Sequence, residues 1–451
     1  MEKKVTVIGA GLAGCEAAYA LAKRGVKVTL IEQKSVKKSA AHKSDNFCEL
    51  VCSNSLKAFR LNSAAGLLKT EMEFLGSLTV PIAKQTAVPA GGALAVDREK
   101  FETAVTKAIK ENENITVLQK EQKDILSLVH NNGCNNYNGS NGTGGNSSNI
   151  VIIATGPLTD GSFAESLKKL TGGMEMFSFY DAAAPIVNID TVDMEHAFWA
   201  SRYKDDQKDY LNCPLTKEEY LRFYNELINA ERAVLHDMDK IYEGCMPIEV
   251  LAHKGVDTMR FGPLKAVGLQ DPKTQKRPYA NLQLRKETVN GNMYNLVGFQ
   301  TNLKFGEQKR VFSFIPALKN AEYERYGVMH RNSFLNSPML LNETLNLKSH
   351  NNIFIAGQLS GVEGYMESAA SGIMCGINAF RMLNNKEMLV LPDITMMGGL
   401  FKYITTPQKH FQPMGAAFGL LPALDVRIKD KLERYMALAE RSVEYFKNKS
   451  F

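Results

Sequence analysis

The chain lacks several features that mark membrane and secreted proteins. Its 451 residues contain no run of about eighteen apolar residues, which argues against an ordinary membrane-spanning helix. The first predicted strand begins almost at Met1, so we expect no signal or transit peptide and a cytosolic location. The seven cysteines are odd in number and scattered, which argues against a disulfide framework and makes any important thiol a candidate for catalysis. We expect no metal ion, no membrane contact and no obligate protein partner.

The composition is that of an ordinary globular protein, and its length requires more than one domain. Hydrophobic residues make up 44% of the chain and charged residues 23%. The formal net charge is +6, but the basic residues gather in two stretches. Lys34 to Lys69 contains seven Lys and Arg residues, and Lys265 to Arg310 contains nine. Such stretches are usually solvated loops; the sharper interpretation is contact with a polyanion such as RNA.

The strongest motif is a glycine-rich turn near the N-terminus. The apolar pattern over residues 4–32 predicts a strand, a turn, a helix and a second strand that ends at Glu32. Gly9 permits the tight bend, Gly11 lets the backbone approach a pyrophosphate, and Gly14 lets the helix pack closely. Glu32 is placed to accept hydrogen bonds from a ribose. The predicted Rossmann nucleotide site consists of Gly9, Ala10, Gly11, Leu12, Ala13, Gly14 and Glu32.

Two later strands favour FAD over NAD as the nucleotide. Residues 150–154 and 353–356 are apolar, and each run leads into a glycine-containing turn, as expected where parallel strands deliver their carboxyl ends to a ligand. Both turns resemble those of flavoproteins of glutathione reductase type. The resemblance places these further residues at the cofactor: Ala154, Thr155, Gly156, Gly357, Gly364, Tyr365 and Met366. The small residues 369–376 suit a flavin neighbour, but they equally suit a helix that only packs tightly.

The expected fold class is α/β, with a Rossmann-type FAD-binding domain of glutathione reductase type and an inserted smaller α+β domain. We assign residues 1–177 and 335–451 to the FAD-binding domain and 178–334 to the insertion, in which charged helices, including 217–240, precede short strands. Residues 131–149, rich in Asn, Gly and Ser, predict a disordered loop. A last helix over about 429–447 has an apolar face made by Leu432, Met436, Ala439, Val443 and Phe446.

Two cysteines are candidates for chemistry. Cys52 lies inside the first basic stretch, where nearby cations favour a thiolate. Cys245 lies between Gly244 and Pro247, which fix a turn that could present the sulfur. An inert buried thiol is the alternative for both. Cys48 allows a different hypothesis, a Cys48–Cys52 redox disulfide facing the flavin of a dithiol reductase, although no second GxGxxG follows a strand.

Six separate blocks of the sequence resemble one enzyme family. They are residues 9–18, 49–55, 244–249, 330–332, 357–367 and 409–414. They resemble the folate- and FAD-dependent tRNA (uracil-5-)-methyltransferases, a family related to the wobble-uridine modification flavoproteins. The resemblance extends over nearly the whole chain, and the Asn-rich segment falls outside every block.

This resemblance implies a defined reaction. 5,10-Methylenetetrahydrofolate gives its one-carbon unit to reduced FAD, the flavin passes it to C5 of a uridine, and a hydride from the flavin completes the methyl group; NAD(P)H reduces the flavin. C5 of uracil is a poor nucleophile, so a thiolate must add at C6. Cys245 matches the family cysteine for that attack, and Cys52 matches a second cysteine near the flavin that assists the carrier or proton transfer. The sequence does not decide between the two assignments.

The resemblance also implies contacts with folate and RNA. His330 would stack on the pterin of the folate, with a surface histidine as the alternative, and Tyr365 belongs to the same pocket. The RNA-binding candidates are Lys57, Arg60, Lys402, Lys409 and His410. The target uridine must leave its loop to reach thiol and flavin. In tRNA this is the T-loop uridine; ribosomal RNA is the alternative substrate, and an RNA-binding flavoprotein without catalysis is the non-enzymatic alternative.

Overall fold

The computed structural model describes residues 5–39, 41–129, 149–174, 176–202, 208–233, 240–241, 246–287, 292–409, 411–449 and 451. For residues 178–182, 240–241 and 330–331 only the backbone is described. The loop predicted over 131–149 lies outside these ranges except for its last residue. No helix in the described ranges is long and apolar enough to cross a membrane.

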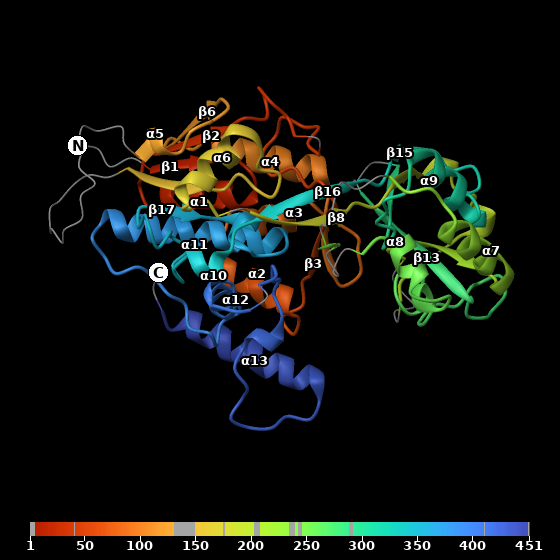
Figure 1. The fold of residues 1–451 in the computed structure, drawn as a ribbon. Helices are drawn as coiled ribbons and strands as arrows, with labels where there is room; N and C mark the ends of the chain where they lie inside the picture. The colour runs from red at the N-terminus through yellow and green to blue at the C-terminus, as the bar shows by residue number, and fades with distance from the viewer. Residues whose placement is uncertain are drawn as a thin grey trace.

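A parallel sheet forms the centre of the larger half of the molecule (Figure 1). In the described residues its strand order is β17-β7-β1-β2-β6. The strands are β1 (Val5–Ile8), β2 (Val28–Glu32), β6 (Ile115–Gln119), β7 (Ile150–Ile153) and β17 (Ile353–Ile355). Because every neighbouring pair is parallel, the carboxyl ends of all these strands meet at one edge.

Both faces of this sheet are buried. Val7 belongs to the apolar cluster shared with α1 (Leu12–Ala22) and α11 (Tyr365–Leu383), whereas Ile8 packs with α6 (Gly161–Leu170) on the opposite face. Burial on both sides explains why these strands read as continuous apolar runs. The other helices of this half are α2 (Ala64–Phe74), α3 (Thr79–Gln85), α4 (Arg98–Lys110), α5 (Leu126–Val129), α10 (Ser337–Leu340), α12 (Met396–Thr405) and α13 (Lys431–Lys447). A small sheet, β3 (Ser55–Ala58), β5 (Ala93–Val96) and β4 (Ala87–Val88), completes it.

A second apolar cluster, drawn from residues 187–321, forms a separate core. It packs around an antiparallel sheet of order β10-β11-β13-β14-β9-β15 in the described residues. The strands are β9 (Ile186–Asn188), β10 (Phe198–Ala200), β11 (Tyr210–Leu215), β13 (Ala280–Lys286), β14 (Met293–Leu296) and β15 (Tyr323–Arg325), and the helices are α7 (Lys217–Ile228), α8 (Ile248–His253) and α9 (Phe305–Phe312). The domain boundaries at 177 and 334 stay a prediction.

Two strands lead from one core to the other (Figure 1). β8 (Phe177–Ala182) and β16 (Met329–Phe334) pair antiparallel along their whole length, and β12 (Lys240–Ile241) joins β8 on its other side. The chain therefore enters and leaves the second core along neighbouring strands.

Three local predictions were wrong. The helix expected over 217–240 ends at Ile228, because the following residues pair with another segment: Ala233 donates to the Asn302 carbonyl, and Arg232 bridges to Leu303. Strands also precede this helix rather than only following it. In the last helix, Leu432 is 58% exposed, because the first turn of α13 extends beyond the core that buries Phe446.

Candidate functional site

Three glycines shape the turn after β1. Gly9 has a φ of 97°, and a Cβ there would lie 2.4 Å from the Ala154 carbonyl oxygen. A Cβ on Gly14 would lie 1.8 Å from the Gly9 carbonyl oxygen. At Gly11, by contrast, a Cβ would meet no neighbouring atom of the described residues within 4 Å. The fold therefore requires Gly9 and Gly14, whereas Gly11 faces open space at the N-terminus of α1, where a phosphate can approach.

Glu32, the predicted ribose acceptor, lies at the end of β2 and is 8% exposed. Its carboxylate accepts hydrogen bonds from the backbone N–H groups of Ala10, at 2.7 Å, and Lys34, at 2.8 Å. Glu32 thus ties the glycine turn to the loop after β2, a structural task that the sequence did not reveal. Lone pairs that remain on the carboxylate leave the predicted ribose contact open.

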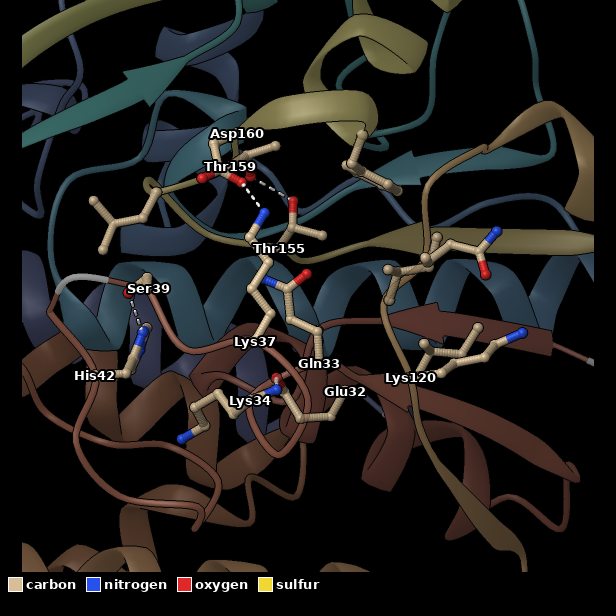
Figure 2. A pocket seen from close by; sticks show the side chains of 16 residues that line it. Glu32, Gln33, Lys34, Lys37, Ser39, His42, Lys120, Thr155, Thr159 and Asp160 are labelled. Carbon is tan, nitrogen blue, oxygen red and sulfur yellow. Dashed lines mark hydrogen bonds and ion pairs between the residues drawn. The ribbon is translucent and has the colours of Figure 1, made fainter.

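A pocket opens beside Glu32 at the carboxyl edge of the sheet (Figure 2). Loops after β1, β2, β6 and β7 line it, and its empty volume is about 630 Å³, including solvent at its mouth. Lys37 bonds Asp160 at 3.1 Å across the pocket, and the hydroxyls of Thr155 and Thr159 are 2.7 Å apart. The place and the polar lining fit the adenosine end of a dinucleotide.

The late glycine turn lies against the first one. Gly357 has a φ of 75°, donates its N–H to Ser371 Oγ at 2.7 Å, and would bring a Cβ to 3.2 Å from that of Ala13. A Cβ on Gly372 would lie 2.0 Å from the Ala13 carbonyl oxygen, so α11 and α1 are in backbone contact. Close packing thus accounts for the small residues of α11. The N-termini of α1 and α11 lie next to each other, and the contact of this region with a flavin stays a prediction.

Cys52 and Tyr365 meet although 313 residues separate them. Cys52 Sγ and the Tyr365 hydroxyl oxygen are 2.9 Å apart, and that oxygen also accepts the backbone N–H of Cys52 at 2.9 Å. Burial raises the pKa of Tyr365 well above its usual range, and the neighbouring sulfur adds to this effect. The half-buried thiol therefore sits at the N-terminus of α11, beside a phenol that keeps its proton.

Cys48 does not share this environment. It is 1% exposed, has a φ of 56° and donates its N–H to the Ala10 carbonyl. Its sulfur lies against Cys15, where burial and the Cys48 contact raise the pKa of Cys15 well above its usual range. Cys48 and Cys52 are both unbridged. The two sulfurs thus have different neighbours, Cys15 and Tyr365, which speaks against the disulfide hypothesis.

Three of the predicted site residues have no described side chain. Cys245 and His410 lie outside the described residues, and His330 is described only as a backbone position in β16, paired with Asp181 of β8. Close to Cys245 in sequence, Glu249 is buried and accepts hydrogen bonds from the Asn302 N–H at 2.7 Å and Thr301 Oγ1 at 2.9 Å. This carboxylate anchors the segment that follows Cys245.

Much of the first basic stretch is neutralised internally. Four of its seven cations make ion pairs, and Lys69 is fully buried. Lys57, a predicted RNA contact, bonds the buried Glu367 at 2.7 Å, and Lys402 pairs with Asp393 at 2.5 Å. Arg60 and Lys409 are exposed. The fold thus supplies counter-charge or burial for most of this stretch, which neither the solvated-loop nor the RNA interpretation anticipated.

Two buried carboxylates were missed from the sequence. Glu16 accepts the N–H groups of Leu78 and Thr79, both at 2.9 Å, near the start of α3. Glu71 accepts the N–H groups of Met396 and Met397 at the start of α12. Each caps a helix distant in sequence, so no local signal could have revealed it.

Comparison with known proteins gives consistent matches. A family model described as "Glucose inhibited division protein A" matches residues 4–387. The methylenetetrahydrofolate--tRNA-(uracil-5-)-methyltransferase TrmFO of Fusobacterium nucleatum subsp. nucleatum is 51% identical over 450 residues, 99% of each chain. The protein of that name from Enterococcus faecalis is 52% identical over 98% of each chain. GidA of Aquifex aeolicus superposes with a TM-score of 0.67 at 18% identity, covering 99% of this chain and 76% of that one, which supports the predicted fold class.

Proposed function

The chain belongs to the family of methylenetetrahydrofolate–tRNA-(uracil-5-)-methyltransferases, and from this premise we propose that it methylates C5 of the T-loop uridine in tRNA with 5,10-methylenetetrahydrofolate as carbon donor. The observation that carries the proposal is 51% identity over 99% of a relative with that name. The related GidA family model supports a flavin-dependent reaction.

FAD fits the residues at the carboxyl edge of the parallel sheet. The open space at Gly11 suits its pyrophosphate, the pocket beside Glu32 its adenosine, and the start of α11 at Gly364 its flavin. When bound and reduced, FAD supplies the carrier for the one-carbon unit and the hydride that completes the methyl group. We assign its reduction to NAD(P)H.

Cys245 and Cys52 have different roles in the reaction of the uracil base. Cys245 adds as a thiolate to C6 of the uracil and so makes C5 nucleophilic. After C5 has taken the one-carbon unit, its proton must leave so that the Cys245–C6 bond can break and release the thiolate, and we assign that proton transfer to Cys52, next to Tyr365. His330 would stack on the pterin, on the strand pair that joins the two cores.

The RNA must reach this edge with its uridine turned out of the loop. Arg60 and Lys409 are exposed and suit phosphate contacts. Lys57 and Lys402 would have to share their charge with Glu367 and Asp393. The five described cysteines are unbridged, which fits the cytoplasmic location we propose.

Labelled one-carbon transfer tests this function. Purified, flavin-loaded protein is incubated with unmodified tRNA or ribosomal RNA transcripts, carbon-labelled methylenetetrahydrofolate and NADH or NADPH, and nucleosides are then separated. We expect label in 5-methyluridine of the tRNA alone. Label only in ribosomal RNA would redirect the substrate, and thiol-dependent NAD(P)H oxidation without label in either RNA would refute the proposal in favour of a reductase.

A further inference from the structure

The loop that carries Cys52 is held by three arginines from three distant segments. Arg98, at the start of α4, donates to the Leu50 carbonyl, and Arg325, at the end of β15, donates to the Val51 carbonyl at 2.5 Å. Arg285, in β13, donates to Ser53 Oγ at 3.0 Å and Asn54 Oδ1 at 3.1 Å. The residues on both sides of Cys52 are thus fixed by guanidinium groups.

The hydrogen bonds at Tyr365 fix the direction of its own proton. The phenol oxygen accepts the N–H groups of Cys52, at 2.9 Å, and Ser53, at 3.4 Å. With its lone pairs engaged by these two donors, the hydroxyl is left to donate, and Cys52 Sγ lies 2.9 Å away. A sulfur that accepts this hydrogen bond is better matched as a thiolate than as a thiol.

The charges around the loop act in the same direction. The charged or titratable groups around it are Arg98 of α4, Arg285 of β13, Glu287 just after β13, Arg325 of β15 and Tyr365 of α11. Lys57 and Glu367 lie next to Gly364, and their charges cancel in an ion pair. Glu287, which is 1% exposed, bonds Arg98 at 2.6 Å and offsets one cation. Positive charge remains in excess next to the sulfur, which stabilises an anion there.

We propose that Arg98, Arg285 and Arg325 are positioning residues that hold Cys52 as a thiolate, with the Tyr365 hydroxyl as its hydrogen-bond donor. When the thiol ionises, its proton leaves for solvent, and Tyr365 keeps its own. Since Arg285 and Arg325 belong to the sheet of the second core, that core sets the geometry of a sulfur carried by the first. The use of this thiolate in methyl transfer rests on the proposed function, whereas its existence does not.

Alkylation of Cys52 by iodoacetamide as a function of pH tests the inference. The flavin-loaded protein carries Cys245→Ser, and peptide mass spectrometry follows Cys52 alone. We expect a pH midpoint below the value of about 8.5 for a free cysteine. Tyr365→Phe should raise the midpoint by about one unit, because a charge-assisted hydrogen bond is lost. Arg98→Gln should raise it as well, and Arg98→Lys by less.

Matched controls separate positioning from a general loss of structure. Tyr403→Phe and Arg310→Gln remove a half-buried phenol and an exposed arginine elsewhere, and should leave the midpoint unchanged. A wild-type midpoint at or above that of free cysteine, or no rise in Tyr365→Phe, would overturn the inference. Should Arg98→Gln not fold, Tyr365→Phe decides alone. Methylation is measured on the matching proteins that retain Cys245, and it distinguishes the failures. Label in 5-methyluridine without a lowered Cys52 midpoint refutes the thiolate, whereas a lowered midpoint without label refutes the function.

Discussion

Glu71 offers a quantitative test of how burial and hydrogen bonding balance in the larger core. Its fully buried carboxylate accepts the N–H groups of Met396, at 2.6 Å, and Met397, at 2.8 Å, and the hydroxyl of Ser442 at 2.5 Å. Burial raises the pKa of Glu71 from 4.5 to about 7, although these three bonds act in the opposite direction. One carboxyl therefore links α2, α12 and α13 in a pH-dependent way.

The sign of the effect follows from the two protonation states. Between pH 4.5 and about 7 the folded protein retains a proton that the unfolded chain has lost, so the free energy of unfolding falls as the pH rises. From pH 5 to pH 8 the loss due to Glu71 is about 2 kcal/mol. Glu71→Gln removes this titration and leaves one acceptor oxygen for two N–H donors, a loss of about 1 kcal/mol that does not depend on pH.

Urea unfolding of wild type and Glu71→Gln at pH 5 and pH 8 measures the difference. Far-ultraviolet circular dichroism follows the helices, while the only tryptophan, Trp199, reports the second core from β10. In the helical signal we expect wild type to be more stable than Glu71→Gln by about 1 kcal/mol at pH 5 and less stable by about 1 kcal/mol at pH 8, a change of about 2 kcal/mol, with no change at Trp199. Glu73→Gln, on the exposed side of the same helix, is the control. An advantage that is equal at both pH values would mean that the hydrogen bonds outweigh burial and that Glu71 is ionised throughout.

Three further predictions address the nucleotide site, the thiols and the surface. Gly11→Ala should keep the thermal stability of the apoprotein but weaken FAD binding, whereas Gly14→Ala should lower both the stability and the FAD affinity, because its Cβ would meet the Gly9 carbonyl. Thermal unfolding and flavin titration measure these two properties, and equal behaviour of the two variants would contradict the geometry. Cys48→Ser should retain labelled methylation while Cys52→Ala and Cys245→Ala abolish it, and methyl transfer by Cys245→Ala would remove that residue as nucleophile. Lys57→Ala should cost about 1 kcal/mol of stability, because Glu367 is buried and loses its ion pair. Lys409→Ala should leave stability unchanged and weaken tRNA binding in a salt-dependent manner. Equal melting temperatures of these two variants would count against the ion pair.

The sequence predicts best the features that depend on neighbouring residues. The turn at Gly9, Gly11 and Gly14 is local, because each glycine answers a constraint of the strand and helix beside it. The strands at 150–153 and 353–355 are equally recognisable, since burial on both faces makes them apolar throughout.

Features that depend on distant segments were not predictable from the sequence. Arg98, Arg285 and Arg325 are ordinary cations in the sequence, and only the tertiary fold brings them to the Cys52 loop. The helix predicted over 217–240 was too long, because the pairing of Arg232 with Leu303, which follows its true end at Ile228, has no local signal. The charge of Lys34 to Lys69 pointed toward an external anion, but the fold supplies much of the counter-charge itself.

The pairing of β8 with β16 has an evolutionary consequence. Phe177 lies opposite Phe334, so the two points where the chain leaves and re-enters the larger core are about 5 Å apart, one strand spacing. A segment attached at two such close points can be gained or lost by a single genetic event without rerouting the remaining chain. An ancestral flavin-binding protein could have acquired the second core in this way, and with Arg285 and Arg325 it would have received a new environment for a thiol that it already carried.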